Sequence, residues 1–125
     1  MALLHEDLSE RVIGAAIEVH RQLGPGLLES AYEACLEHEL ASNGVKVARQ
    51  VPITLKYKGI AIDEGYRIDL VVEDSILIEL KSVKAVEPVH EAQLMTYLRL
   101  SGIRVGLLMN FNTTVLKNSI IRRVI

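Results

Sequence analysis

The sequence predicts an α/β sandwich in which a mixed sheet of about five strands is flanked by helices, in the order ααβββαββ. The apolar residues recur at helical spacing over the first 42 residues, and they then alternate with polar residues over most of the rest. One further helical segment interrupts the strand-like segments. With 125 residues, of which 50% are hydrophobic, we expect a single domain covering residues 1–125.

Two helices are expected at the start. Residues 6–23 place Val12, Ala16 and Val19 on one stripe, and Leu23-Gly-Pro-Gly26 ends this helix because proline disfavours the helical conformation in the residue before it. A second helix is expected over residues 27–42, ending at Asn43-Gly44.

The remaining elements follow from the change of period. The expected strands cover residues 47–57, 60–72, 75–83, 104–111 and 119–124. Pro52 indicates an edge or a bulge, and the second strand is open to a break near Gly65. A third helix is expected over residues 90–101, after Glu87-Pro88.

Composition restricts the classes of function. The net charge of −2 argues against a broad basic surface for nucleic acid, and one Phe, four Tyr and no Trp argue against extensive base stacking. A single cysteine excludes a disulfide within the chain and a cysteine-based zinc site. The chain has neither a signal-peptide pattern nor an apolar run long enough to span a membrane, so we expect a cytoplasmic protein without membrane contact.

The segment 67–81 carries the most informative charges. A hairpin centred on Asp74 would pair Val72 with Ile76, Leu70 with Ile78 and Ile68 with Leu80 on an apolar face. The other face would then pair Val71 with Leu77, Asp69 with Glu79 and Arg67 with Lys81.

Two carboxylates directly opposite each other destabilise a strand pair, more so when buried. A divalent cation between Asp69 and Glu79 would remove the conflict, and hard cations such as Mg²⁺ prefer oxygen ligands. The alternative is an exposed ion network in which both acids pair with Arg67 and Lys81.

The motifs along the chain resemble those of the PD-(D/E)xK nuclease superfamily and, more closely, the small GxxExxY family. The name-giving motif is Gly26-Leu-Leu-Glu29-Ser-Ala-Tyr32, and Arg67-Ile-Asp69, Glu79-Leu-Lys81 and Gln93-Leu-Met-Thr-Tyr97 follow in order. Ile68 stands where the superfamily name has proline. The resemblance implies a restriction-endonuclease-like fold and a metal-dependent phosphodiesterase.

The resemblance also implies roles for individual residues. Asp69, Glu79 and the backbone carbonyl of Leu80 match metal ligands, and Lys81 matches the lysine that positions or activates water. Glu29 matches a helix acid that joins the metal site, often through water. Its structural alternative is a favourable interaction with the N-terminus of its helix.

Three other side chains are candidates with structural alternatives. Gln93 and Tyr97 share a helix face, either as part of the site or as a polar seam between helix and sheet. His20 is a candidate for contact with phosphate or with the Glu29 segment, or else a core histidine.

Two functions therefore remain open. The first is a nuclease that uses Mg²⁺, or Mn²⁺ in its place, and acts on DNA rather than RNA. The second is a catalytically inactive module with the same fold that binds nucleic acid or protein. A homodimer would widen the substrate surface, and Val115 and Ile120 are candidates for its interface.

Overall fold

The computed structural model describes residues 3–125 and has a five-stranded mixed sheet at its centre, as the sequence predicts. The strand order is β1-β4-β5-β6-β7. The strands are β1 (Val47–Pro52), β4 (Arg67–Val72), β5 (Ile76–Lys81), β6 (Val105–Asn110) and β7 (Ile120–Val124). A short 3-10 helix, η1 (Leu116–Ser119), precedes the last strand.

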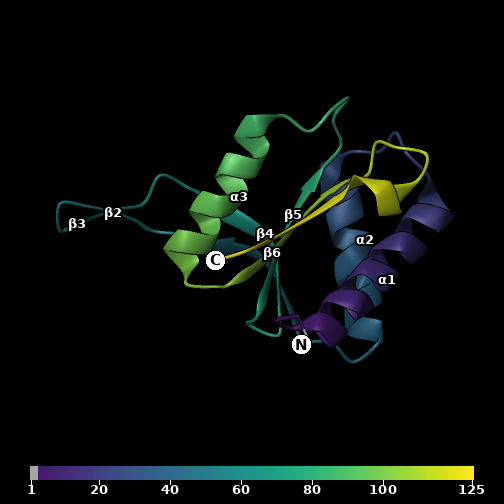
Figure 1. Ribbon diagram of the computed structural model, residues 1–125, viewed down its shortest axis with the longest axis horizontal. Coiled ribbons are helices and arrows are strands. Elements are labelled where there is room, and N and C mark those ends of the chain that lie inside the picture. Colours follow the sequence, from purple (N-terminus) through teal and green to yellow (C-terminus); the bar gives the residue numbers. More distant parts are fainter. Residues whose placement is uncertain (1–2) are drawn as a thin grey trace.

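Helices cover both faces of this sheet. Figure 1 shows α1 (Glu6–Leu23) and α2 (Glu29–Ser42) on one side and α3 (Pro88–Ser101) on the other. The α1–α2 side holds the larger apolar core, which includes Val12, Leu36 and Ile78, whereas Leu77 packs with Leu98 beneath α3. This alternation along β5 explains why the strand is apolar throughout: both of its faces are buried.

The connection from β5 to β6 sets the position of α3. These two strands are parallel, with Glu79 opposite Leu108, so the chain must cross over between them. Gly106 allows a close approach, because a Cβ there would lie 2.9 Å from Leu94 and 3.1 Å from Leu98. The crossover therefore holds α3 tightly against the sheet.

The first two predicted strands are shorter than expected. Residues 47–57 divide into β1 and β2 (Leu55–Tyr57), and residues 60–72 divide into β3 (Ile60–Ile62) and β4. Pro52 cannot donate to a ladder, and Gly65 has a φ of 80°, which suits a break. Strands β2 and β3 form their own antiparallel hairpin, which extends away from the body of the molecule (Figure 1).

The predicted register of β4 and β5 is confirmed for the pairs Val72–Ile76, Val71–Leu77 and Leu70–Ile78, and it is wrong for Ile68 with Leu80. Leu70 lies opposite Ile78, and the ladder between these strands ends there. Ile68 packs in the core beneath α3, whereas Leu80 packs in the core beneath α1 and α2. The side-chain alternation of β4 therefore breaks at Asp69, a break that a strictly alternating strand does not predict.

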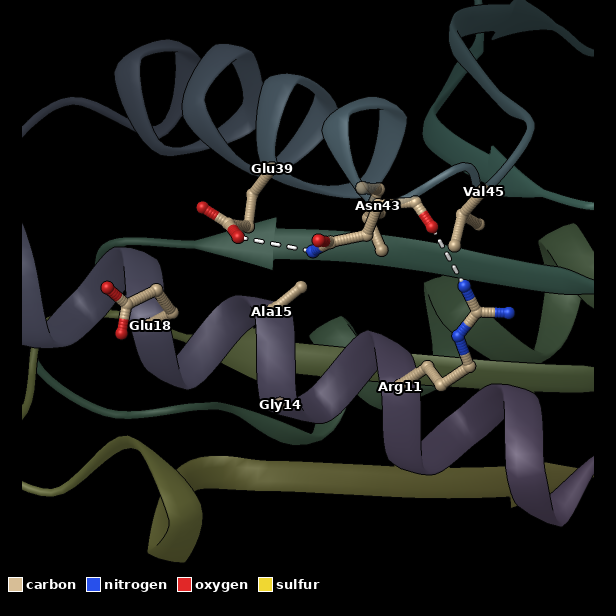
Figure 2. Close-up of a pocket in the computed structure, with 8 residues that line it drawn as sticks. Arg11, Gly14, Ala15, Glu18, Glu39, Asn43 and Val45 are labelled. Carbon is tan, nitrogen blue, oxygen red and sulfur yellow. Dashed lines mark hydrogen bonds between the residues drawn. The ribbon is translucent and has the colours of Figure 1, made fainter.

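The two N-terminal helices enclose a groove of about 430 Å³ on the surface. Figure 2 shows that Arg11 of α1 donates to the backbone carbonyl of Asn43 (3.0 Å), whose side chain donates to Glu39 (3.2 Å). None of the residues that line this groove is a predicted site residue. In residues 3–125 there is no helix with the length and hydropathy that crossing a membrane requires.

Candidate metal and phosphodiester site

The ends of β4 and β5 bring Asp69 and Glu79 together, as the register predicts. The Asp69 N–H donates to Oε1 of Glu79 (3.1 Å), and the Leu80 N–H donates to Oδ2 of Asp69 (2.8 Å). These two bonds continue the strand pair beyond the point where the backbone ladder ends. Each carboxyl group thus accepts a backbone N–H of the opposite strand, as a backbone carbonyl would in a continued ladder. These two hydrogen bonds hold the two carboxyl groups next to each other.

The two carboxyl groups hold their protons unusually tightly. Burial and the neighbouring Asp69 charge raise the pKa of Glu79 to about 8, and burial raises the pKa of Asp69 to about 6. The backbone N–H groups and Lys81 oppose both shifts. Desolvation prevails because Glu79 is only 5% exposed.

The alternative of an exposed ion network is wrong. Glu79 is buried, and no Lys or Arg side chain in residues 3–125 lies within salt-bridge distance of Asp69 or Glu79. Arg67 is exposed and donates to the backbone carbonyl of Tyr66. Lys81 is half-buried and near enough to both acids to act on their pKa values without forming an ion pair.

Glu33 of α2 is a third acid at this site, and it is absent from the residues that the sequence predicts there. Its side chain is buried, and its charge raises the pKa of Asp69 and of Glu79. Arg49 forms a salt bridge with it, and the Gln50 side chain donates to it (2.6 Å). The available signal was spacing: Glu33 lies one turn after Glu29 and beside the buried Tyr32.

The strand that supplies these partners is strained next to the acids. Gln50 has a φ of 54°, in the left-handed region that favours glycine. It lies between the pairs Arg49–Leu70 and Val51–Ile68, and so faces Asp69 across the two strands. The break in β4 at Asp69 therefore has a counterpart in β1.

Glu29 lies at the N-terminal end of α2, where it binds the chain that follows β5. Its Oε2 accepts the Ser82 N–H (3.0 Å), and the Ser82 hydroxyl donates to the Leu27 carbonyl (2.8 Å). Glu29 is exposed and borders a hollow of about 350 Å³. Glu29 therefore faces solvent and lies next to the backbone of Lys81. Glu33, and not Glu29, is the helix acid whose charge raises the pKa of Asp69 and of Glu79.

Tyr32, the last residue of the motif Gly26-Leu-Leu-Glu29-Ser-Ala-Tyr32, fixes the loop between α1 and α2. Its hydroxyl donates to the Gly24 carbonyl (2.6 Å) and accepts the Leu27 N–H (3.1 Å), while its ring stacks on Phe111 with centroids 4.5 Å apart. This gives the aromatic residue of the motif a structural role in setting where α2 begins.

Gln93 and Tyr97 lie on α3, which covers the opposite face of the sheet from α2 with its Glu29 and Glu33. The Gln93 amide donates to the Tyr97 hydroxyl (2.9 Å). Burial and the nearby charge of Glu79 raise the pKa of Tyr97. The structure therefore brings this pair to the acid cluster, although the pair is also part of the contact between helix and sheet.

His20 is buried on α1, where its Nε2 lies 2.8 Å from the Thr113 carbonyl and its ring lies 6.1 Å from that of Phe111. These contacts connect α1 to the loop after β6. They match the core-histidine alternative, and contact of His20 with phosphate stays a prediction.

The donor set fits a hard cation in chemistry. One oxygen of each acid accepts a backbone N–H, which leaves Oδ1 of Asp69 and Oε2 of Glu79 for a metal. The Leu80 carbonyl points to the same side of β5 as its N–H, toward Asp69. Within the described part of the chain, no group of three His, Cys, Asp or Glu side chains is placed to hold an ion, so protein ligands would be few and water would supply the rest.

Comparison with known proteins gives one finding. A family model described as the PD-(D/E)XK nuclease superfamily matches residues 6–124. No curated protein and no solved structure matches the chain.

Proposed function

This chain belongs to the PD-(D/E)XK nuclease superfamily, and from that membership we propose that it is a metal-dependent nuclease that hydrolyses phosphodiester bonds in DNA, with RNA the less favoured substrate. The motif around Glu29 supports a place in the GxxExxY family within it. The observation that carries the proposal is the pair Asp69 and Glu79, two adjacent acids that are largely buried and have no cationic partner within ion-pair distance in residues 3–125.

The metal ligands follow from the donor set. Asp69, Glu79 and the Leu80 carbonyl would hold Mg²⁺, or Mn²⁺ in its place, and Glu29 would join through water. Bound Mg²⁺ supplies polarisation of the phosphate and a lowered pKa of water. Asp69 and Glu79 must give up their protons to bind it, so binding favours high pH.

Lys81 serves the reaction by position and charge. It follows Leu80 on β5 and lies half-buried near both acids. Its ammonium would orient the attacking water and stabilise the negative charge that develops on the phosphate.

The remaining polar side chains complete the walls of the site. Gln93 would orient a water through its carbonyl oxygen, because its amide nitrogen already donates to the Tyr97 hydroxyl. Tyr97 and His20 are candidates for substrate contact. Glu33 would fix Asp69 from α2 through its own attachment to Arg49.

The second candidate is a module that has kept the fold and lost the activity, binding nucleic acid or protein. A net charge of −2 and a scarcity of aromatic residues favour it. So does the small number of protein ligands for a metal.

Cleavage assays separate the two candidates. Duplex DNA, single-stranded DNA and RNA would be incubated with wild type in Mg²⁺, Mn²⁺ or EDTA, beside Lys81→Met and, as a matched control, Lys84→Met. We expect cleavage that requires the metal and is lost in Lys81→Met alone. Metal binding without cleavage of any substrate would favour the inactive module.

A further inference from the structure

The β2–β3 hairpin stands apart from the rest of the fold in residues 3–125, because its strands pair only with each other. It projects from the body beyond the edge of the main sheet (Figure 1). A lone two-stranded hairpin has little stability of its own in water. A contact with a partner would therefore add order to this element more than to any strand of the main sheet.

The base of the hairpin is attached to the wall of the candidate site. Pro52 pairs with Arg67, and the Ile53 N–H donates to the Tyr66 carbonyl (3.0 Å). The Tyr66 ring meets the Tyr97 ring edge-on, with centroids 6.4 Å apart. Ile53 and Tyr97 pack in the same apolar cluster as Ile68, the residue before Asp69, so an object bound at the acids would also lie close to the root of the hairpin.

The tip combines cations with exposed apolar side chains. Tyr57 and Ile60 lie opposite each other on one face, and their exposed fractions are 60% and 62%. The Lys58 Nζ lies 5.4 Å from the centre of the Tyr57 ring, and Lys56 projects from the other face. Residues 55–62 contain these two lysines and no acid, in a chain whose net charge is −2.

We propose that the β2–β3 hairpin is a nucleic-acid-binding arm of the site, in which Lys56 and Lys58 contact phosphates and Tyr57 packs against a base or sugar. The proposal rests on the proposed nuclease function and specifies how substrate is held. A two-stranded ribbon fits the major groove of DNA, and apolar side chains of such elements can wedge between bases.

The dimensions permit one nucleic acid to touch both the hairpin and the acids. Tyr57 is five residue steps along the chain from Pro52, so it lies at most ~17 Å from the base of the hairpin. That length corresponds to about five nucleotide steps of a DNA strand. The hairpin would thus contact phosphates several nucleotides from the bond that is cut.

A second copy of this chain fits the tip less well. The apolar groove beside the hairpin, of about 550 Å³, has Asp74 as its one acidic lining residue, and Asp74 already forms a salt bridge with Lys46. Such a groove offers little to neutralise two lysines. Phosphate offers a negative charge to each.

The test measures binding of fluorescein-labelled duplex and single-stranded DNA by anisotropy, in Ca²⁺ to hold the metal site without relying on turnover. The Lys56→Gln/Lys58→Gln variant is compared with Lys46→Gln/Lys117→Gln, which changes the net charge equally. We expect the hairpin variant to bind about tenfold more weakly and to reduce the slope of log affinity against log salt by about 1 to 2, with little change in the control.

Tyr57 separates packing from charge. We expect Tyr57→Ala to weaken binding roughly tenfold with an unchanged salt slope, and Tyr57→Phe to bind like wild type. Unchanged melting temperatures would show that all variants fold.

The possible failures are distinguishable. If wild type cuts DNA and the hairpin variants bind it as tightly, the arm is overturned and the nuclease stands. If wild type binds no nucleic acid, both are overturned. If sedimentation shows a wild-type dimer that the Tyr57→Ala variant loses, while DNA affinity is unchanged, the hairpin contacts a second copy and the proposal is wrong.

Discussion

Both ends of the β4–β5 hairpin carry two acids with a lysine nearby, but the acids at one end are solvated and those at the other end are largely buried. At the turn, Glu73 and Asp74 are exposed. Glu73 accepts the backbone N–H of Lys46 (2.7 Å), and Asp74 forms a salt bridge with the Lys46 ammonium (2.8 Å). At the other end, Asp69 and Glu79 have Lys81 nearby without an ion pair, and backbone N–H groups as their direct partners.

This contrast indicates which of the two acid pairs needs a functional explanation. Water and a flexible lysine satisfy the acids at the turn at little cost, so those acids need no further explanation. The acids at the other end are desolvated and keep raised pKa values of about 6 and about 8. A fold that maintains such a pair has an arrangement that a cation would stabilise.

The largest expected effect is on cleavage. We expect Glu79→Gln to lower the rate of DNA cleavage by about 10³-fold or more, because it removes a charged ligand of the proposed metal. Glu73→Gln is the matched control on the same strand pair and should cleave like wild type. Equal loss in both variants would remove the distinction between the two ends.

The pH dependence of stability should differ between the two ends as well. The folded pKa of Glu79 is raised from 4.5 to about 8, so the metal-free native state binds a proton that the unfolded state releases. Its stabilising contribution is complete below about pH 4.5 and is lost as pH rises through about 8. We therefore expect unfolding by urea to become easier over this range.

Glu79→Gln isolates this contribution. The variant should match wild type near pH 5 and exceed it above pH 8, by on the order of 2–4 kcal/mol in the free energy of unfolding. Glu73→Gln should retain the wild-type profile. A constant difference at all pH values would contradict a raised pKa at Glu79.

A smaller effect is expected from Glu33. Glu33→Gln keeps the volume and a hydrogen-bonding group but breaks the salt bridge with Arg49, at a cost of about 1–2 kcal/mol. It also removes a negative charge beside Asp69, so the pKa of Asp69 should fall. Carboxyl carbon chemical shifts followed by NMR over pH report this directly, and an unmoved Asp69 titration would show that Glu33 acts elsewhere.

The smallest effect belongs to the turn. Lys46→Ala removes the exposed salt bridge with Asp74 and should leave the midpoint of urea unfolding nearly unchanged, with any difference diminishing further in high salt. Chemical denaturation at two ionic strengths checks this. A large loss of stability would mean that the turn is not the solvated end that we describe.

Much of the fold was predictable because hydrophobic period and turn residues specify it. The α/β class, the five-stranded sheet and the pairing of Leu70 with Ile78 all follow from where apolar residues recur. The separate β2–β3 hairpin did not follow, since Val47 to Tyr57 reads as one continuous run. Pro52 and Gly65 were the two signs of the division.

The acids that the sheet contributes to the candidate site, Asp69 and Glu79, were predictable from the sequence, whereas Glu33 of α2 was not. The predicted register brought Asp69 and Glu79 together, although the backbone ladder ends one pair earlier, at Leu70 and Ile78. The break of alternation that sends Ile68 to the other core is a tertiary effect, matched by the strained Gln50 across the strands. Glu33 was missed because its burial depends on Arg49 and Gln50, which lie far along the chain.

The proposed cation site can be tested by calorimetric titration of Mn²⁺ and Mg²⁺ into metal-free protein near pH 7, in two buffers that differ in ionisation enthalpy. We expect wild type and Asp74→Asn to bind metal with release of protons, since Glu79 is protonated at that pH until the metal displaces the proton. Glu79→Gln should bind at least tenfold more weakly. Binding that is unchanged in Glu79→Gln, or that is lost equally in Asp74→Asn, would contradict the assignment of the buried pair as the cation site.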